Sequence, residues 1–259
     1  MSRVALRQAT ALSRRSILNL LRQPDAVFPS LFFPLFFAAL SSAAFERSTR
    51  LPGFPPVDSF LDFLLAATVV QGVVFGSTTG GSNMAVDIQD GFFDRLVASP
   101  VPRWSILVGR LAGAALQGAV QAVFFVTVLT LFGATVKGGL LAVVVIVVVA
   151  GLLAVAMGGL SLTVALRTGS REAVEAAFPL FFITIFVSSA FFPRELMSGW
   201  FKAVATTNPL SWMIESLRRL TIDDFAVADA LTALAVVVGF GAVTLSMAGA
   251  ALRRRVAAR

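Results

Sequence analysis

Long runs of uncharged residues alternate with short charged segments along the whole chain. Six runs contain no Asp, Glu, Lys or Arg, at residues 26–45, 63–86, 111–136, 138–166, 176–193 and 230–252. Because an α-helix rises about 1.5 Å per residue, roughly 20 apolar residues cross a hydrocarbon core about 30 Å thick. Each run reaches or nearly reaches that length. The pattern therefore predicts an all-α integral membrane protein with six transmembrane helices.

Composition supports this class and narrows the chemistry. The chain is 57% hydrophobic and 14% charged, whereas a soluble domain usually carries about 25% charged residues. Six spans in 259 residues leave no room for a separate soluble domain. The chain has no Cys and no His, which argues against disulfides, thiol catalysis and the usual transition-metal sites.

Charge is distributed unevenly among the segments that join the predicted spans. With the first segment placed inside, 14 of the 21 basic residues fall in cytoplasmic segments, which leaves a net charge of about +8 inside and −1 outside. The positive-inside rule then places both ends of the chain in the cytoplasm. We therefore attribute the pI of about 11.4 to topology and to contact with anionic lipid headgroups, and not to nucleic-acid binding.

Residues 1–25 precede the first span and are rich in arginine. On a helix over residues 3–22, five arginines fall within an arc of about 120°, and these are Arg3, Arg7, Arg14, Arg15 and Arg22. This pattern predicts an amphipathic helix lying on the membrane, and a basic leader that only sets topology is the alternative. A cleaved signal peptide is disfavoured, because the apolar run starts late and exceeds a usual signal core.

Polar residues inside the predicted spans are few. In the third span, Gly109, Gly113, Gln117 and Gln121 follow one another at four-residue steps, so they share one face of the helix. Two interpretations stay open for these two glutamines and for Gln71 in the second span. They either provide amide hydrogen bonds between packed helices or line a substrate path.

Residues 194–225, between the fifth and sixth spans, are too polar to cross the membrane and too regular for a loose loop. Asn208 followed by Pro209 is a typical helix start. After it, apolar residues repeat at helical spacing, at Leu210, Met213, Ile214, Leu217 and Leu220. We expect two short re-entrant helices that dip into the outer leaflet and return.

Side chains in the same segment suggest how it is held. Glu215 is expected to face Arg218 and Arg219, which lie three and four residues further along the same helix. Three aromatic residues are suited to headgroup depth, namely Trp200, Phe201 and Trp212. An amphipathic hairpin lying on the membrane surface is the alternative to a re-entrant segment.

The sequence carries no motif for catalysis or for energy transduction of its own. No Gly-x-x-x-x-Gly-Lys-Ser/Thr phosphate loop occurs. The six uncharged runs also lack the carboxylates and histidines that ion-coupled carriers use as relays. If the chain moves a solute against a gradient, we expect the energy to come from another subunit.

The segment between the second and third spans, residues 84–106, has the pattern of a docking helix. An acidic face is formed by Asp87, Asp90 and Asp94, and an apolar ridge by Ile88, Phe92 and Leu96. Pro100 and Pro102 end this helix before the third span. Such a helix suits docking into a groove on a partner protein, and a solvated helix beside the membrane is the alternative.

Two stretches carry a resemblance to a known family. The first reads Asp-Gly-Phe-Phe-Asp-Arg-Leu-Val-Ala-Ser-Pro-Val-Pro-Arg over residues 90–103, followed by Gly-Arg at 109–110. The second reads Phe-Pro-Arg-Glu-Leu-Met-Ser-Gly-Trp over residues 192–200, followed by Asn-Pro-Leu-Ser at 208–211. With the six spans, the N-terminal helix and the length, the chain resembles the type-2 ATP-binding-cassette (ABC) exporter permeases, especially the daunorubicin-resistance-type membrane subunits. Ser198 departs from the pattern, since relatives often have Pro there.

The resemblance implies that residues 84–103 contain a coupling helix, which contacts a separate ABC nucleotide-binding ATPase subunit. The residues expected at that contact are Asp87, Asp90, Gly91, Phe92, Asp94, Arg95, Leu96, Pro100 and Arg103. It also implies that the re-entrant helices form an outer gate, with Pro193, Trp200, Asn208, Pro209 and Arg218. This chain is expected to bind no cofactor, and ATP and Mg²⁺ are expected on the ATPase subunit.

Together these expectations describe the permease subunit of an ABC exporter in the bacterial plasma membrane, not an enzyme. Its domains are the interfacial helix (1–25), the six-span permease (26–252) and a basic cytoplasmic tail (253–259). A second copy or a paralogue is expected beside it, around a path for lipophilic drugs or lipids. The alternatives are a permease for glycans or lipid-linked polymers, a proton-driven secondary carrier and a non-transporting scaffold.

Overall fold

The computed structural model describes residues 10–11, 13–18, 24–99 and 103–257, without the side chains of residues 24–26 and 103. All regular structure in these ranges is helical, which confirms the predicted all-α class. In chain order the helices are α2 (Pro24–Phe45), η1 (Glu46–Arg50), α3 (Phe60–Phe75), α4 (Thr79–Gln89), α5 (Phe92–Ala98), α6 (Arg103–Leu131), α7 (Gly139–Thr168), α8 (Arg171–Ala176), α9 (Phe178–Phe186), η2 (Arg194–Leu196), α10 (Gly199–Thr207), α11 (Pro209–Ile222) and α12 (Val227–Ala257).

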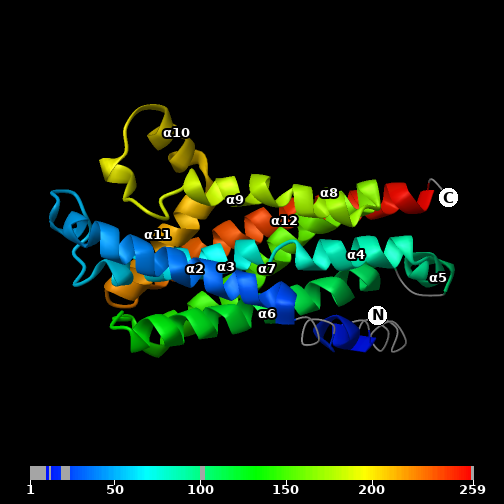
Figure 1. Ribbon diagram of the computed structural model, residues 1–259, viewed down its shortest axis with the longest axis horizontal. Coiled ribbons are helices and arrows are strands. Elements are labelled where there is room, and N and C mark those ends of the chain that lie inside the picture. Colours follow the sequence, from blue (N-terminus) through cyan, green and yellow to red (C-terminus); the bar gives the residue numbers. More distant parts are fainter. Residues whose placement is uncertain (1–9, 12, 19–23, 100–102, 258–259) are drawn as a thin grey trace.

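The long helices lie along the longest axis of the molecule (Figure 1). One end carries α5, the C-terminal part of α12 and the helical residues 13–18, and we call it the α5 end. The other end carries α10, η1 and the turn between α6 and α7, and we call it the α10 end. The two segments singled out by the sequence, residues 84–106 and 194–225, therefore belong to opposite ends of the bundle.

Helices α3 and α4 form the centre of the bundle. The apolar stretch within Phe60–Gln89 is 89% buried, whereas that within Val27–Arg50 is 22% buried. α7 packs against α4, α6 and α12, and α11 packs against α3 and α12. Gly81 lets α4 approach α7 closely, because an added Cβ would lie 2.7 Å from the carbonyl oxygen of Ser161. Small residues serve this purpose in membrane helix packing.

Five helices of the described chain are long and apolar enough to cross a membrane, which supports a multi-pass membrane protein. They are Val27–Arg50, Phe60–Gln89, Trp104–Leu131, Gly139–Thr168 and Val227–Ala257. The last of them includes residues 253–257, so this part of the predicted tail continues α12. Of the predicted N-terminal helix over 3–22, residues 10–11 and 13–18 are helical, and the rest lies outside the described residues.

The predicted fifth span, residues 176–193, is not confirmed as one helix of spanning length. Its first residue, Ala176, ends α8, its residues 178–186 form α9 after a break at Ala177, and the chain is irregular from Val187 to Pro193. Pro179 explains the division, because it has no N–H to donate to the carbonyl oxygen of Glu175 and its ring crowds that carbonyl. α8 and α9 follow one another along the long axis of the bundle (Figure 1).

Residues 194–225 form the two predicted helices, α10 and α11. The side chain of Asn208 caps α11, with its Oδ1 accepting a hydrogen bond of 2.9 Å from the N–H of Leu210. The five apolar residues named above are all buried. Glu215 interacts electrostatically with Arg218, as expected. The expected pairing with Arg219 was wrong, because Glu215 forms its ion pair with Arg194 and Arg219 pairs with Asp229 of α12. Ion pairs with residues outside α11 form instead of ion pairs within it, because α11 is buried along one side.

Candidate functional site

The predicted coupling segment folds as two helices and not as one. α4 continues to Gln89, Asp90 follows as its C-cap, and Gly91 turns the chain with a φ of +70° before α5 begins at Phe92. Glycine occupies this left-handed region without the steric cost of a Cβ. The prediction of a single helix was wrong, because a helical pattern of side chains can continue across a glycine that ends the helix.

The three aspartates therefore do not form one exposed acidic face. Asp87 is buried in α4, whereas Asp90 and Asp94 are exposed. The apolar ridge is also divided. Its first member, Ile88, is buried with Phe93 in a cluster of α4, α6, α7, α8 and α12 residues.

The exposed part of the segment is α5 itself. Its surface carries Asp94 and Arg95, while Phe92 and Leu96 are half-buried. Phe93 is fully buried and fixes α5 to the bundle. Pro100 and the side chain of Arg103 lie outside the described residues. The short helix thus projects at the α5 end (Figure 1) while one of its side chains is anchored in the protein.

Asp87 joins three segments of the chain through its carboxylate. Arg15 of the N-terminal helix donates from Nη2 to Oδ1 at 2.9 Å and from Nη1 to Oδ2 at 3.2 Å. Arg110 of α6 forms a second ion pair with Asp87 Oδ2. The Arg15 guanidinium also lies over the Phe92 ring, 3.9 Å from its centroid. The N-terminal helix, α4, α5 and α6 therefore meet at one ionic cluster.

This cluster is unequally exposed to solvent. The side chain of Arg15 is 39% exposed, against 10% for Arg110 and 11% for Asp87. Partial burial lowers the pKa of Arg15 from its ordinary value, but an arginine stays protonated at neutral pH. Two cations share one carboxylate, so the cluster keeps a net positive charge. Sequence reasoning missed this arrangement, because the only signal for it is the presence of charges at the ends of apolar runs.

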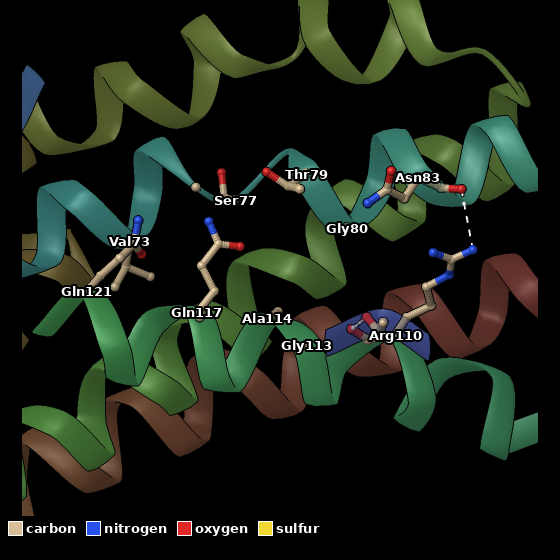
Figure 2. Close-up of a pocket in the computed structure, with 13 residues that line it drawn as sticks. Val73, Ser77, Thr79, Gly80, Asn83, Arg110, Gly113, Ala114, Gln117 and Gln121 are labelled. Atoms are coloured by element: carbon tan, nitrogen blue, oxygen red, sulfur yellow. Dashed lines mark hydrogen bonds between the residues drawn. The ribbon is translucent and has the colours of Figure 1, made fainter. Parts of the chain in front are cut away.

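A polar cleft lies further along the same side of α6. It is lined by Ser16, Val73, Gly76, Ser77, Thr79, Gly80, Asn83, Arg110, Gly113, Ala114, Gln117, Gln121 and Ala154. Figure 2 shows the Gln117 amide directed from α6 towards Ser77, at the junction of α3 and α4. The structure thus brings together Gln117 and Gln121, as the four-residue spacing predicts. Gln71 is buried elsewhere on α3 and does not line the cleft.

The predicted gate residues gather around α10 and α11 but have different environments. Pro193 is buried before η2, whereas Trp200 on α10 is 72% exposed. Asn208 donates from Nδ2 to the carbonyl oxygens of Thr184 and Val187 at 2.6 and 3.2 Å. Pro209 occupies the first turn of α11. Asn208 and Pro209 therefore tie the start of α11 to the end of α9.

Arg218 is buried and donates to backbone carbonyl oxygens, while the carboxylates of Glu215 and Glu195 act on it electrostatically without an ion pair among the described residues. Its Nε donates to the carbonyl oxygen of Phe63 at 2.9 Å, and its Nη2 donates to those of Ser189 and Ala190 at 2.8 and 3.1 Å. The guanidinium also lies 3.6 Å from the centroid of the Phe63 ring. Arg218 thus fixes the irregular segment after α9 to the first turn of α3.

Comparison with known proteins places this fold in a family. The sequence model of the ABC-2 type transporter matches residues 7–221. A putative transport permease, ycf38, of Cyanophora paradoxa is 24% identical over 218 residues, which cover 83% of this chain and 74% of the relative. The daunorubicin resistance ABC transporter permease protein DrrB1 of Streptomyces coeruleorubidus is 28% identical over 198 residues, which cover 76% of this chain and 67% of the relative.

These matches confirm the resemblance that the two sequence stretches indicated. The family match includes the α4–α5 turn, the cleft residues of α6 and nearly all of α11. The relatives are transport permeases by name, and one is a permease of an ABC transporter. The chain therefore belongs to the ABC-2 type transporter family.

Proposed function

We propose that this chain is the membrane subunit of an ATP-driven exporter and that α5 receives the movement of a separate ATPase subunit. The proposal is carried by the geometry of α5, a short helix at one end of the bundle with Asp94 and Arg95 exposed and Phe93 anchored. Because Phe93 keeps α5 packed against the bundle, a movement of α5 is passed on to α4. ATP and Mg²⁺ belong to the partner subunit.

The push from α5 has two routes into the bundle. One passes through the Gly91 turn into α4 and the buried centre. The other passes through the ion pairs of Asp87 to Arg110 on α6 and to Arg15 on the N-terminal helix. In this proposal, α8 and α9 together provide a sixth crossing, and both ends of the chain lie in the cytoplasm. A second copy of the chain or a paralogue completes the complex in the bacterial plasma membrane.

The proposed cargo is a lipophilic drug or a lipid. Its support is the apolar character of the spans and the name of the relative that acts in daunorubicin resistance. Anionic lipids are proposed to contact the basic N-terminal helix, where Arg14 is exposed. α10, with Trp200 and Phe201, is proposed to lie at the outer headgroups beside the gate.

The coupling role can be tested with a charge reversal and a matched control. Arg95→Glu on α5 is expected to reduce co-purification of the ATPase subunit about tenfold or more, because it changes the charge of the proposed contact. Arg167→Glu reverses an exposed arginine of α7 at the same end and is expected to leave co-purification unchanged. Full retention of the ATPase by the Arg95 variant would contradict the proposal.

The energy source and the cargo are tested in inside-out vesicles that contain the chain with its ATPase subunit. We expect daunorubicin accumulation that requires ATP, is blocked by vanadate and persists with an uncoupler. Loss of accumulation with the uncoupler while ATP is abundant would favour the secondary-carrier alternative. ATP-dependent transport of a lipid-linked glycan, but not of daunorubicin, would favour the polymer-export alternative.

A further inference from the structure

The junction of α3 and α4 is an interruption of a buried helix. α3 ends at Phe75 and α4 begins at Thr79, with a turn at residues 76–78. Non-helical backbone at membrane depth is tolerated where protein or a water-filled cavity satisfies it. No proline explains this break, since residues 60–89 contain none. The interruption lies at the polar cleft, whose lining includes Gly76, Ser77 and Thr79.

Two glutamine amides of α6 converge on this junction. A Cβ added to Gly76 would lie 2.7 Å from Nε2 of Gln117 and 3.3 Å from Nε2 of Gln121. Glycine is therefore the residue that leaves room for both amides. Gln121 is satisfied, because its Nε2 donates to Oγ of Ser30 at 2.7 Å.

Gln117 is not satisfied by protein atoms. Its side chain is 7% exposed, and its Nε2 has no hydrogen-bond partner among the described residues. An unpaired buried amide costs about 1–3 kcal/mol, so such a group usually has a partner that is not a protein atom. In Figure 2 this amide points into the cleft between α6 and the α3–α4 junction.

The start of α4 lies at the same place. The first N–H groups of a helix have no partner inside the helix, and α4 has no side-chain cap at Thr78. Helix N-termini favour groups with negative charge or acceptor oxygens. Thr79 and Gly80, the first two residues of α4, both line the cleft. The N–H of Thr79 already donates to the carbonyl oxygen of Gly76 at 3.4 Å, so Gln117 supplies the side-chain donor, and the positive end of α4 adds to the preference for an acceptor oxygen.

Charge favours the same kind of ligand. Arg110 lines the end of the cleft nearest α5 and donates from Nη2 to the carbonyl oxygen of Asn83 at 3.4 Å. It lies about 10 Å along α6 from Gln117, seven residues away. With Arg15 and Asp87 it forms the cluster of net positive charge described above. A molecule entering along this side meets cationic groups first and neutral donors deeper in.

The size of the cleft limits what enters it. It holds about 440 Å³ of space free of protein atoms, counting its open mouth, of which about 30 Å³ admits the centres of water molecules. Since one water needs about 10–15 Å³ by this measure, the inner space takes roughly two waters. It accepts one oxygen-bearing group, while the remainder of a larger molecule stays outside.

We propose that this cleft binds an acceptor oxygen of an amphipathic molecule in the cytoplasmic leaflet, with Gln117 as the donor. The oxygen is a phosphoryl oxygen of a phospholipid or a carbonyl or hydroxyl oxygen of the exported cargo. If the oxygen belongs to the cargo, the inference rests on the proposed function, and the cleft is then a position at which cargo enters a single copy of the chain. If the oxygen belongs to a phospholipid, the inference does not depend on whether the chain transports anything.

The test uses the purified full-length chain in nanodiscs of dioleoylphosphatidylcholine, without ATP. Two probes are titrated, namely daunorubicin, followed by its fluorescence, and dioleoylphosphatidylglycerol, followed by its retention in native mass spectrometry. Gln117→Leu removes the donor at nearly constant volume. Gln71→Leu is the matched control, because Gln71 is buried as well, at 3% exposed, and its Nε2 has no partner among the described residues, but it lies outside the cleft.

A second variant fills the cleft without touching the glutamines. Gly80 lines the cleft, and a Cβ there meets no atom of the described residues within 4 Å, so Gly80→Leu adds bulk at the wall of the cleft. Gly249→Leu on α12 is its control, since a Cβ there also meets no atom within 4 Å. We expect Gln117→Leu and Gly80→Leu to weaken the binding of one of the two probes about five- to tenfold, which is the effect of one lost hydrogen bond. The two controls are expected to change binding less than twofold.

The outcomes separate the sources of the oxygen. If the cleft variants bind daunorubicin more weakly, the bound oxygen comes from cargo. If they retain less phosphatidylglycerol, it comes from a resident phospholipid. Unchanged binding of both probes in both cleft variants would show that the cleft holds water only and would overturn the inference. Failure of the proposed function is seen separately, as absence of ATP-dependent transport by the wild-type complex with its ATPase subunit.

Discussion

The two ends of the bundle both bury charge, but they satisfy it in different ways. At the α5 end, the carboxylate of Asp87 pairs with Arg15 and Arg110, so side chains from three segments meet. At the α10 end, Arg218 donates to three backbone carbonyl oxygens. Asp62 there accepts from the backbone N–H groups of Ser59 and Thr135 at 3.0 and 2.6 Å.

The difference concerns what can be rearranged. A backbone carbonyl cannot turn away without moving its helix, whereas a side-chain ion pair can exchange partners by rotation of a few bonds. The α10 end also contains a side-chain ion pair, between Arg194 and Glu215, but Arg218 and Asp62 fix it mainly through backbone groups. The α5 end is held by contacts that can be broken and remade, which suits the end proposed to receive an external push.

The largest expected effect is at the fixed end. Arg218→Ala removes a donor from three buried carbonyl oxygens, of which only that of Phe63 keeps a partner inside its helix, and we expect a loss of about 3 kcal/mol or more in the free energy of unfolding. The neighbouring Arg219→Ala breaks an ion pair whose arginine is 46% exposed and is expected to cost about 0–1 kcal/mol. Thermal unfolding of the purified variants measures both. Equal losses would show that Arg218 is not a structural clamp.

The next effect is at the centre of the ionic cluster. Asp87→Asn leaves the buried guanidinium of Arg110 without a carboxylate, and we expect a loss of about 2–3 kcal/mol in stability. Asp90→Asn changes an exposed residue three positions away and is expected to have an effect within about 0.5 kcal/mol. Unfolding midpoints of the two variants give the comparison. An Asp87→Asn variant as stable as Asp90→Asn would show that the carboxylate of Asp87 does not stabilise the bundle through its ion pairs.

The α4–α5 turn has a counterpart at the other end of the bundle. Gly91 and Gly199 have φ values of +70° and +58°, and within the part of the chain that the structure describes a Cβ on either meets no atom within 4 Å. Alanine at each position is expected to cost about 1–2 kcal/mol from the backbone alone. Only Gly91→Ala is expected to weaken co-purification of the ATPase subunit as well. A similar loss of the ATPase with Gly199→Ala would show that strain in general, and not the α5 turn, is responsible.

The smallest effect is expected for the outermost ion pair. Arg15→Ala is expected to cost about 1 kcal/mol or less, because Arg15 is partly exposed and Arg110 still pairs with Asp87. Its clearer consequence is local: a cysteine at Ser16, which packs against Gly113 of α6, should react a few times faster with a soluble maleimide. Arg14→Ala, at an exposed neighbour, is the control. An unchanged rate would mean that Arg15 does not hold the N-terminal helix.

The apolar runs predicted most of the long helices, because burial in a membrane requires length and hydrophobicity above all. Asn208 and Pro209 predicted the start of α11, since capping depends on residues adjacent in sequence. The break between α3 and α4 was not predicted. It contains no proline, and it depends on the space that Gly76 leaves for amides of another helix.

The candidate site was less accessible to sequence reasoning. Arg15 and Asp87 are 72 residues apart, so their pairing depends on the packing of three segments. The same holds for the glutamines: Gln71 and Gln117 look alike in sequence, but only Gln117 lines the cleft. Local patterns identified the segments that matter and did not assign partners to their side chains.

The central claim, that α5 is the contact with an ATPase subunit, is tested most directly by a single cysteine on α5. The chain contains no Cys, so Phe92→Cys gives one reactive position. We expect a membrane-impermeant maleimide to label it in inside-out vesicles, the ATPase subunit to protect it, and a short bifunctional reagent to cross-link the two proteins. Labelling only in right-side-out vesicles, or equal labelling with and without the bound ATPase, would contradict the account.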